Sequence, residues 1–104
     1  MLSIIIPTFN REKGILRLLE YYINKSNFKI IILDSSEIKY TSVEFKSFVK
    51  NSRVTYFHFD KKILLVEKII KGLKAVNTKY VVLCADDDIT SINALKVCTH
   101  FLEK

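Results

Sequence analysis

The chain has 104 residues and a net charge of +6, with 17 Lys and Arg against 11 Asp and Glu. Hydrophobic residues make up 49% of it and the mean hydropathy is +0.16, which excludes a disordered chain and favours one domain with a dense core. No apolar run approaches the ~20 residues of a membrane-spanning helix, and the start lacks the basic segment of a signal peptide. We therefore expect a cytoplasmic protein, and its lysine excess leaves open a peripheral position at an anionic membrane surface.

Four segments have the apolar, β-branched composition of strands, and a helical pattern follows each of them. The strands are predicted over residues 3–6, 29–33, 54–59 and 80–84. The first, second and fourth are continuous apolar runs, which is typical of strands covered on both faces of a sheet.

The helical patterns gather apolar residues into stripes. The stripe after the first strand comprises Ile15, Leu18, Leu19, Tyr22 and Ile23, and the stripe after the third comprises Val66, Ile69, Ile70, Leu73 and Val76. Spacings of three and four residues predict amphipathic helices that bury these stripes. Strands that alternate with helices predict an α/β fold, a Rossmann-like, doubly wound parallel sheet with right-handed crossovers.

Polar side chains follow each predicted strand. "PTFNR" follows the first, "DSSE" the second, Asp60 the third and "ADDD" the fourth. In open α/β sheets, ligands bind beyond the carboxyl ends of the strands. Asp and Ser also cap helices and turns, so polar residues after one strand would be weak evidence for a site. Polar residues after all four strands predict a binding site at the carboxyl edge of the sheet.

Individual residues at this edge admit a structural and a functional interpretation. Asp34 either holds a turn or accepts a hydrogen bond from a nucleobase. Thr8, Asn10 and Arg11 are either ordinary loop residues or offer a hydroxyl, an amide and a guanidinium group to a base or diphosphate. Lys68, on the third predicted helix, is either solvated or reaches a phosphate.

Three adjacent carboxylates, Asp86, Asp87 and Asp88, end the fourth strand. A helix N-terminus stabilises one nearby carboxylate by up to about 1 kcal/mol, so capping explains one Asp and not three. Mg²⁺ or Mn²⁺ prefers oxygen ligands and would relieve the mutual repulsion of the three groups. The triplet therefore predicts a divalent metal site.

"SIIIPTFNR" at the start, "IIILDSS" near residue 30 and "KYVVLCADDDI" near residue 80 resemble family 2 glycosyltransferases of the GT-A fold. The resemblance covers nearly the whole chain but only the N-terminal half of such an enzyme. It implies a four-stranded sheet of order 3-2-1-4. It also implies that residues 1–104 are a nucleotide-diphospho-sugar-binding domain, truncated before the acceptor-binding half.

The resemblance also implies roles for single residues. The pocket for base and ribose would be lined by Pro7, Thr8, Phe9, Asn10 and Arg11. Asp34 would accept a hydrogen bond from the base. We assign Asp86 to the ribose and Asp87 and Asp88 to the metal, whereas a strict D-x-D spacing would select Asp86 and Asp88 as the motif.

The reaction implied by the resemblance is transfer of a sugar from a nucleotide diphosphate, with a UDP-sugar as the expected donor, to an acceptor saccharide or lipid-linked glycan. Mn²⁺ or Mg²⁺ would stabilise the negative charge that grows on the leaving diphosphate. An inverting enzyme also needs a general base. In the family this carboxylate comes from the acceptor-binding half, and residues 89–104 offer no candidate, so turnover by this chain alone stays open.

Other functions compete with this one. A fragment that binds nucleotide and metal without transferring sugar uses the same residues. "DDDIT" also fits the D-x-D-x-T motif of haloacid-dehalogenase-type phosphatases, although that motif normally ends the first strand. A receiver domain would need its acidic pair after the first strand, and no nucleic-acid-binding motif supports a nucleic-acid partner. The fourth strand is expected to leave an unpaired edge, which predicts a homo-oligomer.

Overall fold

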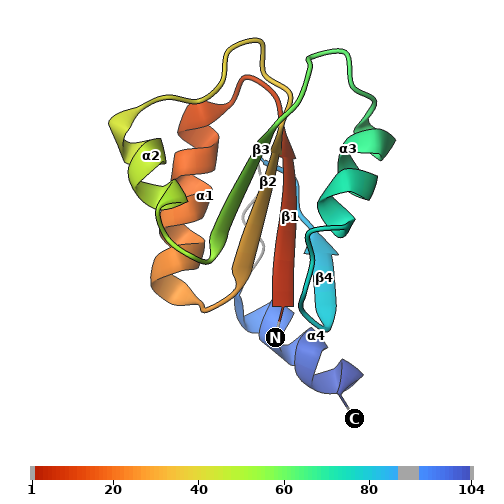
Figure 1. Ribbon diagram of the computed structural model, residues 1–104. Helices are drawn as coiled ribbons and strands as arrows, with labels where there is room; N and C mark the ends of the chain where they lie inside the picture. The colour runs from red at the N-terminus through yellow and green to blue at the C-terminus, as the bar shows by residue number, and fades with distance from the viewer. Residues whose placement is uncertain (1, 87–91, 104) are drawn as a thin grey trace.

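The computed structural model describes residues 2–86 and 92–103. Four strands alternate with four helices, as predicted (Figure 1). In chain order they are β1 (Leu2–Thr8), α1 (Glu12–Lys25), β2 (Lys29–Asp34), α2 (Val43–Val49), β3 (Val54–His58), α3 (Leu65–Leu73), β4 (Tyr80–Leu83) and α4 (Ile92–Leu102). No helix within the described ranges is long and apolar enough to cross a membrane.

The four strands form one sheet of order β3-β2-β1-β4, and every pair is parallel. The predicted α/β fold and strand order are therefore confirmed. β1 lies between β2 and β4. The chain adds β2 and β3 on one side of β1 and then β4 on the other side, so the switch point of the sheet lies between β1 and β4. Because all strands run the same way, their carboxyl ends meet at one edge (Figure 1).

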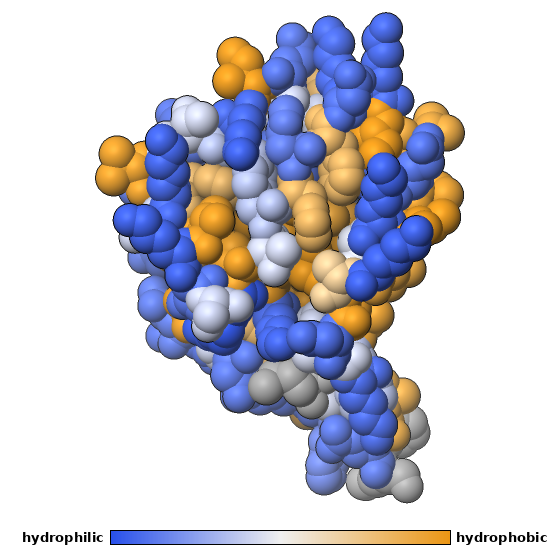
Figure 2. Space-filling view, in the orientation of Figure 1, coloured by the Kyte–Doolittle hydropathy of each residue, from blue (hydrophilic) through white to orange (hydrophobic). Residues whose placement is uncertain are grey.

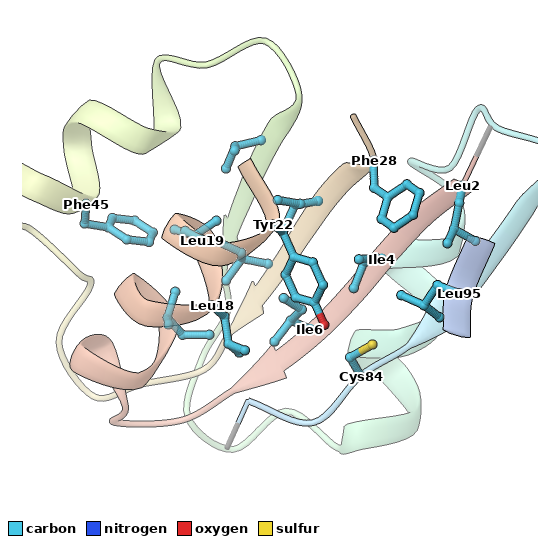
Figure 3. Close-up of a cluster of buried hydrophobic side chains, with 14 of the residues drawn as sticks. Leu2, Ile4, Ile6, Leu18, Leu19, Tyr22, Phe28, Phe45, Cys84 and Leu95 are labelled. Carbon is cyan, nitrogen blue, oxygen red and sulfur yellow. The ribbon is translucent and has the colours of Figure 1, made fainter. Parts of the chain in front are cut away.

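One face of the sheet carries the main core. Ile4 and Ile6 of β1 pack against the α1 stripe, where Leu19 and Tyr22 are fully buried (Figure 3). Leu95 of α4 joins the same cluster, and α2 adds Phe45; each fully buried side chain of this size contributes about 2 kcal/mol. The predicted first stripe is thus buried against the sheet along α1.

The opposite face carries α3, and the orientation of this helix differs from the prediction. Its buried residues are Lys68 and Gly72, whereas Val66, Ile70 and Leu73 of the predicted stripe are 65%, 50% and 46% exposed. Hydrophobic atoms are accordingly visible on this side of the molecule (Figure 2). Gly72 allows the close approach, because an added Cβ would lie 2.7 Å from a side-chain carbon of Leu33.

β4 is also less covered than predicted. Val81 and Leu83 are 41% and 54% exposed, and they share the face on which Ile5 of β1 lies. α3 covers β1 and β2 rather than β4. Within the described residues β4 pairs with β1 alone, so its outer edge is open.

Candidate nucleotide site

The last residues of β1 and β2 lie side by side at the carboxyl edge. Thr8 is paired with Asp34 in the parallel register, and both side chains are buried. Asp86 follows β4, which flanks β1 on the other side. The topology thus brings together three polar residues that lie 26 to 78 positions apart in sequence.

Asp34 is fully buried, and both of its carboxylate oxygens accept hydrogen bonds within the chain. Oδ1 accepts from the backbone N–H of Ser36 at 2.8 Å and from the Ser36 hydroxyl, which forms the turn that the sequence allowed. Oδ2 accepts from the Tyr56 hydroxyl at 2.5 Å. Burial, together with this hydrogen bond, raises the pKa of Tyr56 well above its usual range. The predicted role of Asp34 toward a nucleobase stays a prediction.

The Thr8 side chain joins β1 to Asp86, which follows β4. Its hydroxyl donates to Oδ2 of Asp86 at 2.9 Å, and Nε of Arg11 lies 3.8 Å from the same oxygen. No basic residue lies near Asp86 in sequence, so the fold supplies one from the β1–α1 connection. The Arg11 side chain is 55% exposed and that of Asp86 17%, so water screens the pair and both groups remain accessible to a ligand.

The β1–α1 connection is held by Asn10. Its backbone has φ 53°, in the left-handed region that Asn tolerates better than most residues. Its N–H donates to the Ser36 hydroxyl at 2.6 Å, and its side-chain oxygen accepts from the N–H of Glu37 at 3.3 Å. Neighbouring Pro7 is half-buried, and Phe9 is exposed. Asn10 therefore fixes this connection against the one that follows β2.

Tyr40, which sequence reasoning missed, is buried at the centre of the edge. Its hydroxyl lies 2.9 Å from the Thr8 hydroxyl and accepts from the backbone N–H of Arg11 at 3.0 Å. Its ring stacks on Tyr56 with centroids 6.0 Å apart, and its N–H donates to the Tyr56 hydroxyl at 3.1 Å. No motif or spacing marks Tyr40, because its partners come from distant parts of the chain.

Lys68 reaches the edge from α3. The side chain is buried, and its ammonium donates to the carbonyl oxygen of Thr8 at 3.3 Å and to the Ser35 hydroxyl at 2.9 Å. Burial lowers the pKa of Lys68, and the nearby carboxylates of Asp34 and Asp86 act in the opposite direction. Lys68 thus ties the ends of β1 and β2 together, and contact with a phosphate stays a prediction.

The metal-binding prediction falls partly outside the described residues, because Asp87 and Asp88 lie there. Within residues 2–86 and 92–103 no group of three His, Cys, Asp or Glu side chains could hold an ion. Asp86 offers a hard carboxylate oxygen of the kind that Mg²⁺ and Mn²⁺ prefer, with Oδ2 shared by Thr8 and Arg11. The donor chemistry at Asp86 therefore suits the cation.

A cavity of about 560 Å³ opens beside Arg11 at the start of α1. It is lined by Asn10, Arg11, Glu12, Lys13, Gly14, Leu16, Arg17, Ser42 and Glu44. A Cβ added at Gly14 would lie 3.4 Å from the backbone oxygen of Asp86, so Asp86 lies close to this end of the helix. The cavity, with the cationic side chains of Arg11, Lys13 and Arg17, is therefore adjacent to the carboxyl edge of the sheet.

The chain matches the family model described as "Glycosyl transferase family 2" over residues 3–104. No curated protein matches it. The family transfers sugars from nucleotide-sugar donors to acceptors, generally with divalent metals, and the parallel sheet of order 3-2-1-4 is consistent with half of a GT-A fold. The match extends from β1 to α4 and lends no support to the phosphatase alternative. The chain therefore belongs to glycosyltransferase family 2.

Proposed function

We propose that this domain binds a nucleotide-diphosphate sugar through a divalent cation and presents it for transfer to an acceptor hydroxyl. One observation carries the proposal: Thr8, Arg11 and Asp86 converge where β1 meets β4, at the switch point of the sheet. Ligands of doubly wound sheets bind at such points.

The chemistry of the edge suits each part of the donor. Asp86 offers a carboxylate to a ribose hydroxyl, and the exposed guanidinium of Arg11 can pair with a diphosphate. Asp34 can accept from the N–H of a uracil ring once the Tyr56 hydroxyl leaves its Oδ2, so we expect a UDP-sugar. Asp87 and Asp88 are the proposed metal ligands, with Mn²⁺ or Mg²⁺ as the ion.

The proposed cation supplies positive charge to the diphosphate as the bond to the sugar breaks. The protein's own part is to hold the donor: Arg11 contributes charge, and the partly buried Thr8–Asp86 hydrogen bond fixes the carboxylate in place. No described residue is assigned as the general base. Binding without transfer by these 104 residues is therefore the second form of the proposal.

Calorimetry with UDP, with and without Mn²⁺, tests the binding step. We expect Mn²⁺-dependent binding that the double substitution Asp87→Ala, Asp88→Ala abolishes. The free energy of unfolding should stay equal or rise, because like charges are removed. The matched control is Glu103→Ala, which removes an exposed carboxylate near Leu2, at the opposite end of β1 from the proposed site.

Equal, metal-independent binding by the wild type and the double variant would end the metal-site proposal. A loss of about 1 kcal/mol of stability per Asp with binding unchanged would assign these residues to capping instead. Incubation of the bound domain with a UDP-sugar and a soluble saccharide then separates transfer from binding alone.

A further inference from the structure

We propose that Tyr40 occupies the position of the nucleoside in this structure, so that nucleotide binding requires the Tyr40 side chain to leave. This inference rests on the proposed function, since it concerns the same edge of the sheet. Tyr40 would then set the affinity and selectivity of the site by competing with its ligand.

The first step is the direction of the hydrogen bonds around the Tyr40 hydroxyl. The Thr8 hydroxyl has one hydrogen, and it is donated to the Asp86 carboxylate, which only accepts. Tyr40 therefore donates to Thr8 and accepts from the N–H of Arg11. A ribose hydroxyl, which both donates and accepts, would form the same two bonds.

The second step concerns Asp34. The Tyr56 hydroxyl donates to Oδ2 of Asp34 and accepts from the backbone N–H of Tyr40, so Tyr40 also holds the group that covers this carboxylate. Ser36 occupies Oδ1, and Asp34 has no exposed surface. A nucleobase N–H can reach Asp34 only after this aromatic pair moves.

The third step is the ring itself. The Tyr40 ring lies nearly parallel to that of Tyr56, at an interplanar angle of 19°, and meets Phe45 edge-on. A flat ring stacked on the tyrosine that covers Asp34, with a hydroxyl bonded to Thr8 and to the N–H of Arg11, has the shape and polarity of a nucleoside. Tyr40 lies in the connection 35–42, which forms no helix or strand and is anchored to the β1–α1 connection through Asn10.

The alternative is that Tyr40 is a fixed wall of the pocket. The two arrangements predict opposite changes in the Kd for UDP when the Tyr40 hydroxyl is removed. Tyr40→Phe removes both hydroxyl bonds and keeps the ring. If Tyr40 is an occupant, the binding-competent fraction grows, and the Kd for UDP with Mn²⁺ should fall about three- to tenfold. If Tyr40 is a wall that contacts the ligand, the Kd should rise.

Tyr80→Phe is the matched control, because Tyr80 begins β4 at the end remote from Asp86, where the ammonium of Lys79 lies over its ring. Its Kd should equal that of the wild type. Tyr56→Phe, which frees Oδ2 of Asp34, should also lower the Kd for UDP. A decrease in Kd that Tyr80→Phe shares would overturn the assignment to Tyr40.

Acetylation of tyrosines with N-acetylimidazole, mapped by mass spectrometry, follows the displacement directly. Tyr40 is 5% exposed, so it should be protected without ligand and become reactive with saturating UDP and Mn²⁺. Unchanged or stronger protection in the bound state would overturn the proposal while the proposed function stands. If neither the wild type nor any variant binds UDP, both fail, whereas binding by Tyr40→Phe alone would support full occlusion.

Discussion

The two helices α1 and α3 pack on opposite faces of the same sheet and use their apolar stripes in opposite ways. α1 buries its stripe, with Leu19 and Tyr22 at 0% exposure. α3 turns Lys68 and Gly72 toward the sheet and leaves Ile70 half exposed. The position of α1 on the sheet is therefore set by its hydrophobic stripe. The position of α3 is set by the buried ammonium of Lys68, which bonds to the ends of β1 and β2 at the candidate site.

The largest difference between α1 and α3 should appear in the free energy of unfolding when one aliphatic side chain on each helix is shortened to Ala. Leu19→Ala on α1 should lower the free energy of unfolding by about 2–5 kcal/mol, because it leaves a cavity in the core. Ile70→Ala on α3 should change it by less than about 1 kcal/mol, because half of that side chain is already in water. Urea denaturation measures both, and equal losses would show that the α3 stripe is covered in solution.

A smaller effect, specific to α3, is expected from Lys68 and depends on pH. Because burial lowers the pKa of Lys68, the folded protein binds fewer protons than the unfolded chain between that lowered pKa and the ordinary value of 10.5. The wild type should therefore gain stability as pH rises through this window and show no such gain below it.

Lys68→Met removes this titration, so the difference in unfolding free energy between the two proteins should change with pH only in the alkaline window. The raised pKa of Tyr56 acts in the opposite direction above pH 10 but is common to both proteins. Denaturation curves at pH 7, 8, 9 and 10 provide the measurement. A difference that stays constant across this range would mean that the ammonium is not held in a desolvated position.

The fold could be predicted because strand composition and helical spacing are local properties. The spacing of Val66, Ile70 and Leu73 showed that they share one side of a helix, but it could not show which side meets the sheet. That choice depends on Gly72, which lets the backbone approach Leu33, and on Lys68, whose partners lie on other elements. Both are tertiary effects.

The residues of the candidate site likewise divide into those that the sequence could place and those that it could not. Thr8, Asp34 and Asp86 could be placed at one edge because parallel strands share their carboxyl ends. Tyr40 could not, since its hydroxyl meets Thr8 across 32 positions and its connection has no periodic pattern. The contact between Arg11 and Asp86 was likewise hidden, because the two residues belong to different loops.

A substitution on β4 is expected to have the smallest effect on stability. It tests whether a second copy of the chain covers the strand that α3 leaves exposed. We predict self-association through the outer edge of β4, which no other described strand pairs with and where Leu83 is 54% exposed. Leu83→Lys adds a charge to this edge, which opposes strand pairing, but should leave the free energy of unfolding within about 0.5 kcal/mol. Light scattering should therefore find the wild type associated at high concentration and the variant shifted to monomer.

Val97→Lys on α4 is the control, since it adds the same charge at an aliphatic side chain that is 68% exposed on another element. It separates loss of the β4 contact from the general repulsion that a net charge of +6 already imposes on any pair of copies. Raising the salt concentration screens that repulsion and should strengthen association of the wild type and of Val97→Lys. It should not restore Leu83→Lys fully, because a lysine on the strand face still replaces an apolar contact. A wild type that stays monomeric at every salt and protein concentration would contradict pairing through β4.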